Sequence, residues 1–289
     1  MALVLNEEHR LLQDSAREFL GANATVGALR KLRDERDTLG YSPELWQQMA
    51  ELGWASIILP EAYGGLDFGF TGLGVVMEET GRTLTASPLF ASAVIGASVI
   101  LLGGDEQQKN TLLPEIAAGK LTLALALEES HHHRPCHIST TAVAKDGRYV
   151  ISGSKTFVLD GHSADQLLVV ARTGGEQHSS TGLSLFLVNR DASGLEIQRT
   201  IMVDSRNAAN VSFDCVTVEE SARVGELGQA WQVLEPALDR ARVAIAAEMM
   251  GLSIEAFERT IEYLKEREQF GARIGSFQGL QHRAAHIQS

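Results

Sequence analysis

The sequence of 289 residues contains little cysteine, few aromatic residues and few positive charges. Its two cysteines, Cys136 and Cys215, lie far apart, which excludes a disulfide framework and a Cys-x-x-Cys clamp. Twenty-five Lys and Arg residues stand against 37 Asp and Glu residues, a formal net charge of −12. No basic stripe offers a surface for nucleic acid, so nucleic-acid partners are not expected. No run reaches the ~18 apolar residues of a membrane span, so none is predicted.

Two common catalytic motifs are also missing. No Gly-x-Gly-x-x-Gly follows a strand, which argues against a Rossmann dinucleotide-binding unit, and Gly-x-Ser-x-Gly is absent, which argues against an α/β-hydrolase. The first eight residues turn acidic early and lack the basic and apolar regions of a signal peptide, which predicts a cytoplasmic location. The length allows two or three domains of ~100–200 residues each, and 44% hydrophobic residues exclude general disorder.

Residues 1–120 have a helical period and are predicted to form an N-terminal helical domain. Asn6 is expected to cap a helix with an acidic first turn, because acidic side chains stabilise the positive end of the helix dipole. Ser42 followed by Pro43 predicts the start of another helix. Further helices are expected over residues 71–82, 87–102 and 105–118.

Residues 121–225 change to a period of two and are predicted to form a middle β-domain. Asp146-Gly147 indicates a type I′ hairpin, and residues 172–181 are expected to form a long exposed connection. Short strands without intervening helices favour a small antiparallel barrel or sandwich over a parallel sheet. Strands are expected at 121–127, 141–145, 148–151, 156–159, 167–171, 183–188, 195–199 and 211–218.

Residues 226–289 are helical again and predict a partial C-terminal helical domain. Apolar residues at 3–4 spacing extend over about 228–267, and Pro236 is expected to bend this helix or to mark its true start. A second helix is expected from near Phe277. One long helix and a short one give a truncated bundle, and the predicted fold class is therefore α+β.

Several polar motifs have a structural and a functional interpretation. The run of histidines over 131–137 suggests zinc at first sight, but consecutive histidines point in different directions, so a mobile polar loop is favoured and no metal site is predicted. Arg267 either completes a helix C-terminus or offers a fork to a phosphate. Asp239 and Arg242 by themselves indicate a charged helix face.

Short motifs occur together in register at residues 60–65, 113–114, 119–120, 153–155 and 267–278. In this combination they resemble the acyl-CoA dehydrogenase family, flavoproteins that oxidise acyl-CoA thioesters between the α and β carbons. The resemblance covers essentially the whole chain and implies three domains: helical, β, and helical. It also implies FAD, an acyl-CoA substrate, an acceptor of the electron-transfer flavoprotein type, and a homo- or hetero-oligomer, either dimer or tetramer.

The resemblance implies how the flavin would be held. The family's flavin loop aligns with residues 125–130, so backbone groups of Leu127 and Glu128 are expected near the flavin, although Glu128 replaces the family's threonine. The family's Trp-Ile-Thr aligns with residues 157–159. Phe157 can stack in place of Trp, whereas Leu159 has no hydroxyl to bond the flavin.

Other residues of the resemblance serve a neighbouring subunit or the substrate. Arg267, Gln269 and Phe270 match the family's Arg-x-Thr-Phe-Gly, which reaches across a dimer interface to the partner's FAD. Gln278 matches a second residue of that shared site. An Asp-x-x-Arg stretch that lies along acyl-CoA in the family corresponds to Asp239 and Arg242.

No catalytic residue is predicted within this sequence. Family members use a glutamate to remove the α-proton while a hydride leaves the β-carbon. The usual glutamate lies in the bundle beyond Ser289, and the alternative position is occupied by Ala241. Two hypotheses follow: FAD-dependent dehydrogenation of an acyl-CoA to a 2-enoyl-CoA, or a non-catalytic subunit of a heteromeric enzyme that supplies contacts to its partner's FAD.

Overall fold

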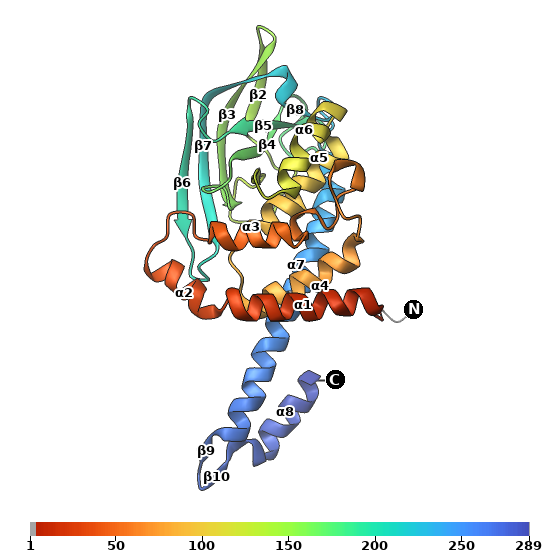
Figure 1. Ribbon diagram of the computed structural model, residues 1–289. Coiled ribbons are helices and arrows are strands. Elements are labelled where there is room, and N and C mark those ends of the chain that lie inside the picture. Colours follow the sequence, from red (N-terminus) through yellow and green to blue (C-terminus); the bar gives the residue numbers. More distant parts are fainter. Residues whose placement is uncertain (1–3, 289) are drawn as a thin grey trace.

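The structure is a computed structural model that describes residues 4–288. Helices of the N-terminal part lie against one side of an open sheet, and a long helix runs from this body to a small separate group of elements at the C-terminal end (Figure 1). The N-terminal part contains α1 (Glu7–Asn23), α2 (Val26–Asp34), α3 (Pro43–Glu51), α4 (Gly69–Thr83), a π-helix (Leu89–Gly96), α5 (Ala97–Gly103) and α6 (Glu106–Ala117).

No helix within residues 4–288 has both the length and the apolar character needed to cross a membrane.

The sheet and the C-terminal elements follow in sequence order. The strands are β1 (Leu123–Ala126), β2 (Thr141–Lys145), β3 (Arg148–Leu159), β4 (Gln166–Arg172), β5 (Leu183–Asn189), β6 (Leu195–Ile201), β7 (Asn207–Glu219) and β8 (Arg223–Val224). The C-terminal elements are α7 (Trp231–Glu266), β9 (Glu268–Gln269), β10 (Ala272–Arg273) and α8 (Gln278–Gln288).

The predicted helix starts are confirmed by their caps. The Asn6 side chain accepts a hydrogen bond from the His9 N–H at 2.8 Å, and the Ser42 hydroxyl accepts one from the Leu45 N–H at 3.1 Å. The expected helix over 87–102 is instead a π-helix that continues into α5. α7 begins before Pro236, so this proline does not mark its start.

The sheet is open and mixed, which corrects the expectation of a closed or purely antiparallel barrel. Its order is β6-β7-β3-β2-β4-β5-β8, and β1 pairs with β4. Most pairs are antiparallel, but β1 and β4 run parallel, as do β2 and β4 at one register position. The chain makes the β2–β3 hairpin between β1 and β4, and this long connection allows two strands to run in the same direction. The predicted α+β class of helices around a middle β-domain is confirmed.

Two expected strands, at 148–151 and 156–159, are one long strand, β3. Its pairing with β7 shifts register twice, between Ile151 and Gly153 and between Lys155 and Val158. The Asp146-Gly147 hairpin is confirmed, because both residues have the positive φ that a type I′ turn requires. Sequence periodicity was broken at the irregular positions, which is why one strand was interpreted as two.

The central part of the molecule depends on a close crossing of α4 and α7. A Cβ atom on Gly81 would lie 2.0 Å from the carbonyl oxygen of Glu248, and one on Gly251 would lie 1.8 Å from that of Glu78. Each helix therefore has a glycine where the other's backbone touches it. This contact places the buried face of α7 directly against the N-terminal helices.

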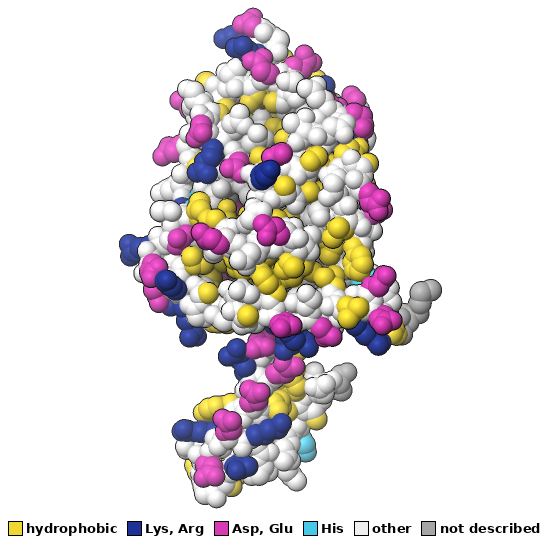
Figure 2. Space-filling view, viewed as in Figure 1, with side chains coloured by type: hydrophobic (Ala, Val, Ile, Leu, Met, Phe, Trp, Pro, Cys, Tyr) yellow, Lys and Arg dark blue, Asp and Glu magenta, His cyan; other side chains and the backbone are white. Residues whose placement is uncertain are grey.

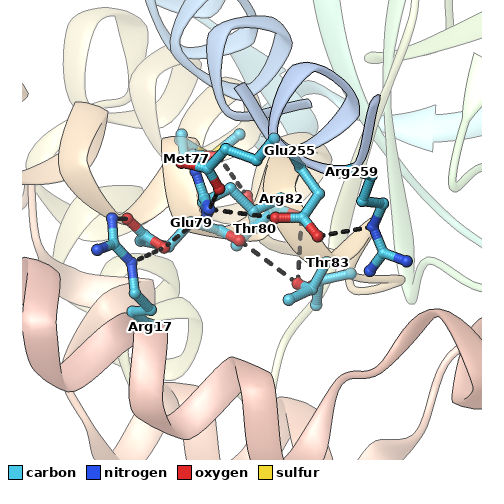
Figure 3. A network of polar contacts seen from close by, with 10 residues as sticks. Arg17, Met77, Glu79, Thr80, Arg82, Thr83, Glu255 and Arg259 are labelled. Carbon is cyan, nitrogen blue, oxygen red and sulfur yellow. Dashed lines mark hydrogen bonds and ion pairs between the residues drawn. The ribbon is translucent and has the colours of Figure 1, made fainter. Parts of the chain in front are cut away.

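An ion-pair network crosses the same junction (Figure 3). The Glu79 side chain is 1% exposed and accepts hydrogen bonds from Arg17 of α1 at 2.8 and 3.1 Å. Arg82 contacts Glu79 at 3.8 Å and reaches Glu255 of α7 at 3.2 Å, while Glu255 also accepts from Arg259 at 2.7 Å. A buried carboxylate of this kind is retained only when it is paired, and this one joins α1, α4 and α7.

Replacement of Gly81 by alanine is expected to destabilise the protein by about 1–3 kcal/mol, because the added methyl forces the α4 and α7 backbones apart. Gly74→Ala on the same helix is the control, since its Cβ would meet only the Ala247 Cβ, at an ordinary 4.0 Å. Urea unfolding followed by circular dichroism measures both changes. Equal stability of the two variants would contradict the close crossing.

Candidate functional site

A cavity of about 300 Å³ lies where the N-terminal helices, the end of β3 and the middle of α7 meet; we call it the slot. Its apolar walls include Phe90, Ile245 and Met249. Phe157 and Leu159, which the sequence placed at a flavin, line it as well. The structure thus brings these two predicted residues together with side chains from two other parts of the chain.

Phe157 reaches the slot through an irregular backbone. It has a φ of 53°, in the left-handed region that aromatic residues rarely adopt, and it lies within the second register shift of β3. Bulges of this kind redirect a side chain relative to the regular strand. The Phe157 side chain is 49% exposed, so its ring stands at an accessible wall rather than in the core.

Charged residues occupy one side of the slot. Asp160, Asp204 and Arg206 line it, and the Arg206 guanidinium donates to the Glu248 carboxylate of α7. Glu248 is 4% exposed, and its second carboxylate oxygen has no hydrogen-bond partner among the described residues. Burial raises the pKa of Asp160 to about 7, although the Arg206 charge acts in the opposite direction.

These charged residues were missed by the sequence analysis. Glu248 follows Ala241 and Ala244 on the buried face of α7, so a carboxylate at helical spacing on an otherwise apolar face was the available signal. Arg206 and Asp160 gave no such signal. They come together only because the loop after β6 and the end of β3 meet at this point.

The loop after β1 contains two carboxylates that bind the backbone. Glu128 accepts from the Arg134 N–H at 3.1 Å and contacts the His133 ring nitrogen at 2.6 Å. Glu129 accepts from the N–H groups of Ser139 and Thr140 at 2.6 and 3.0 Å. The histidine-containing segment is therefore tied at several points, in contrast to the mobile loop that was expected.

A buried lysine completes this arrangement. Lys155 is 2% exposed and donates to Glu129 at 2.7 Å and to the Leu127 carbonyl at 3.0 Å. Burial lowers its pKa to about 8, and Glu129 opposes that change. Burial also acts to raise the pKa of Glu129, but Lys155 and the backbone donors outweigh it and the pKa is lowered. The pair is held as carboxylate and ammonium, with most hydrogen-bonding capacity satisfied internally.

This loop does not fit the pyrophosphate of FAD. A phosphate needs free N–H donors or cations, yet the N–H groups of Arg134, Ser139 and Thr140 already bind carboxylates. Glu128 would repel the phosphates, and Lys155 and Glu129 neutralise each other, so this lysine is not a free cation. The slot offers apolar walls to a ring system, but these backbone N–H groups of the adjoining loop are already bound to carboxylates.

Arg172 organises the neighbouring loops. Its guanidinium donates to six backbone carbonyls, so the connection expected to be a long exposed loop is anchored at its base. The rings of His137 and His178 stack with centroids 4.3 Å apart. Within residues 4–288 no group of three or more His, Cys, Asp or Glu side chains is arranged to hold a metal ion.

The residues predicted to serve a neighbour lie at the other end of α7. Arg267 caps α7, Gln269 lies in β9, and Gln278 begins α8. Phe270, in the β9–β10 turn, is 93% exposed. Figures 1 and 2 show this C-terminal group standing clear of the body, with apolar and charged side chains exposed. A single chain therefore does not bring these residues to Phe157 or Glu128.

The predicted substrate contacts lie in the N-terminal half of α7, before the slot residues Ile245 and Met249. Asp239 and Arg242 form an exposed ion pair one turn apart on α7. Exposed pairs of this kind contribute little to stability, so neither residue is needed there by the fold. Their role in binding stays a prediction.

Comparisons with known proteins extend over the described chain. Models of the acyl-CoA dehydrogenase N-terminal, middle and C-terminal domains match residues 6–120, 126–216 and 228–289. The short/branched chain specific acyl-CoA dehydrogenase of Rattus norvegicus is 30% identical over 97% of this chain and 65% of its own length, so the chain spans about two thirds of that relative.

Two solved structures are similar throughout. The Tcur3481-Tcur3483 steroid ACAD is 35% identical, with a TM-score of 0.84 over 98% of this chain and 74% of that one. The ChsE4-ChsE5 complex of Mycobacterium tuberculosis is 25% identical, with a TM-score of 0.86 over 99% of this chain and 74% of that one.

The raised pKa of Asp160 is expected to make the stability of the protein depend on pH. Because its folded pKa is raised from near 4 to about 7, wild-type stability is expected to fall relative to Asp160→Asn as the pH rises through this interval. The largest change expected in this stability difference is on the order of 4 kcal/mol, which corresponds to the rise of the pKa from near 4 to about 7. Asp146→Asn, on the β2–β3 turn, controls for the loss of one carboxylate. A constant difference between wild type and Asp160→Asn from pH 4 to pH 8 would contradict the burial of this group.

Proposed function

Because the chain belongs to the acyl-CoA dehydrogenase family, whose members bind FAD, we propose that it is a subunit of an FAD-dependent enzyme that oxidises an acyl-CoA thioester to a 2-enoyl-CoA. In this proposal the flavin is held mainly by a neighbouring, different subunit. This chain contributes Arg267, Gln269, Phe270 and Gln278 to it, and the electrons pass to an acceptor of the electron-transfer flavoprotein type.

The observation that carries the proposal is the occupied loop after β1. Glu128 and Glu129 take up the N–H groups of Arg134, Ser139 and Thr140, so this chain presents carboxylates where a pyrophosphate needs donors. The C-terminal group has the opposite character. It exposes Phe270 and carries Arg267, a side chain suited to bidentate contacts with phosphate, away from this chain's own slot.

Two relatives support an assembly of unlike subunits. One is the ChsE4-ChsE5 complex, and the other is a steroid ACAD that carries two protein designations, Tcur3481 and Tcur3483. Both cover nearly all of this chain in space. We propose a hetero-oligomer of the same general kind, with two helical C-terminal groups exchanged between subunits.

A second candidate function is a dehydrogenase that holds its own flavin. The slot favours it, since Phe157, Leu159 and Met249 form apolar walls of the type that a flavin ring or an acyl group requires. The two candidates differ in one property, which is whether the chain by itself retains FAD.

The chain purified alone is expected to carry no stoichiometric flavin, whereas co-expression with a neighbouring FAD-binding homologue is expected to give a flavin-containing complex. Absorbance between 350 and 500 nm (roughly the flavin bands), relative to protein content, measures this. The spectrum of that complex is expected to bleach with acyl-CoA. A yellow homo-oligomer of this chain that oxidises acyl-CoA would establish the second candidate instead.

Within that complex, Arg267→Ala is expected to weaken FAD retention about tenfold or more, because one charge-assisted contact is lost. Arg148→Ala, at the far tip of the β2–β3 hairpin, is the control and is expected to leave retention unchanged (Figure 1). Equilibrium dialysis of the purified complexes gives the two dissociation constants. Equal values would show that this arginine does not contact the partner's flavin.

A further inference from the structure

The slot combines apolar walls with a cluster of charges that is not neutral. Arg206 is paired with Glu248, and Asp160 and Asp204 line the same side. The Arg206 guanidinium thus contacts the Glu248 carboxylate, while the Arg206 backbone N–H donates to Asp204 at 3.0 Å. A cavity intended only for a hydrocarbon chain would gain nothing from these groups, because unpaired polar atoms at an apolar ligand cost binding free energy.

The cluster disfavours anionic ligands. A carboxylate entering the slot would have to displace Glu248 from Arg206 while facing Asp160 and Asp204. The carboxylate would therefore meet like charges in a partly buried place, where repulsion is poorly screened.

A hydroxyl group suits the same cluster, because it can donate and accept at once. It can donate to an oxygen of Asp160 or Asp204 and accept from a free N–H of Arg206. The burial that favours the protonated form of Asp160 adds a second donor below neutral pH. Other common uncharged substituents, such as a methyl or a ketone, would leave the carboxylates without a donor.

We propose that the slot binds the acyl part of an acyl-CoA whose apolar body carries a hydroxyl group, and that Asp160 and Arg206 recognise this hydroxyl. That the ligand is an acyl-CoA rests on the proposed function. The site lies in this chain itself and requires no flavin for binding. Its volume of about 300 Å³ is at the lower end for ligand pockets, which suits an acyl group better than a complete dinucleotide.

The test compares decanoyl-CoA with decanoyl-CoA hydroxylated at the terminal carbon or at a mid-chain carbon. Isothermal titration calorimetry on the full chain, alone and in the flavin-containing complex, gives the affinities without any turnover. At least one hydroxylated probe is expected to bind about tenfold or more tightly than decanoyl-CoA, as one or two hydrogen bonds to charged groups imply. Equal or weaker binding of all hydroxylated probes would overturn the inference.

Two variants locate the effect. Arg206→Met with Glu248→Met removes both members of the ion pair together, which avoids a lone buried charge, and is expected to abolish the preference for the hydroxyl. Ile245→Trp fills the apolar part and is expected to weaken all probes alike. Circular dichroism verifies folding. A hydroxyl preference that survives the double substitution, or probe binding unaffected by Ile245→Trp, would place the ligand elsewhere and overturn the proposal.

Failure here is distinct from failure of the proposed function. A complex that retains FAD through Arg267 and bleaches with decanoyl-CoA, but shows no preference for hydroxylated probes, would contradict the slot inference alone. A chain that holds FAD by itself would contradict the shared flavin site alone. The calorimetric comparison of hydroxylated and plain probes would then still decide whether the slot recognises the hydroxyl.

Discussion

The close crossing of α4 and α7 at Gly81 and Gly251 is the constraint on which the other features depend. Neither glycine tolerates a side chain, because the backbone of the opposite helix occupies the space. With α7 fixed at this point, Ile245 lines the slot and Glu248 pairs with Arg206 of its charged side. The remainder of the 36-residue helix, about 54 Å long in total, carries Arg267 away from the body.

The same arrangement separates two regions of different character. One region consists of the slot and the loop after β1, where Glu128 and Glu129 accept from backbone N–H groups. The other region is the C-terminal group, where the exposed Phe270 lies beside Phe277. The proposed exchange of contacts between subunits is based on this difference.

The accuracy of the sequence predictions varied with the range of the interactions involved. Helix starts at Asn6 and Ser42 were predicted correctly, since a cap depends on residues three positions apart. The Asp146-Gly147 hairpin was equally local. By contrast, the parallel pairing of β1 with β4 and the continuity of β3 through its irregular middle depend on distant strands, and both were misjudged. Phe157 and Leu159 were predicted as neighbours of one site and do share the slot, whereas the opposing Arg206 and Glu248 were not found.

The sequence alone determined the family and the succession of helical, β and helical parts, because motifs and periodicity are properties of adjacent positions. Only the tertiary structure decided what each carboxylate does. Glu128, Glu129, Asp160 and Glu248 are chemically similar in sequence, and their different roles arise from burial and from donors contributed by remote segments. Hydrogen bonding and desolvation depend on residues that are distant in sequence but close in space. The role of each carboxylate therefore follows from the folded structure and not from the sequence.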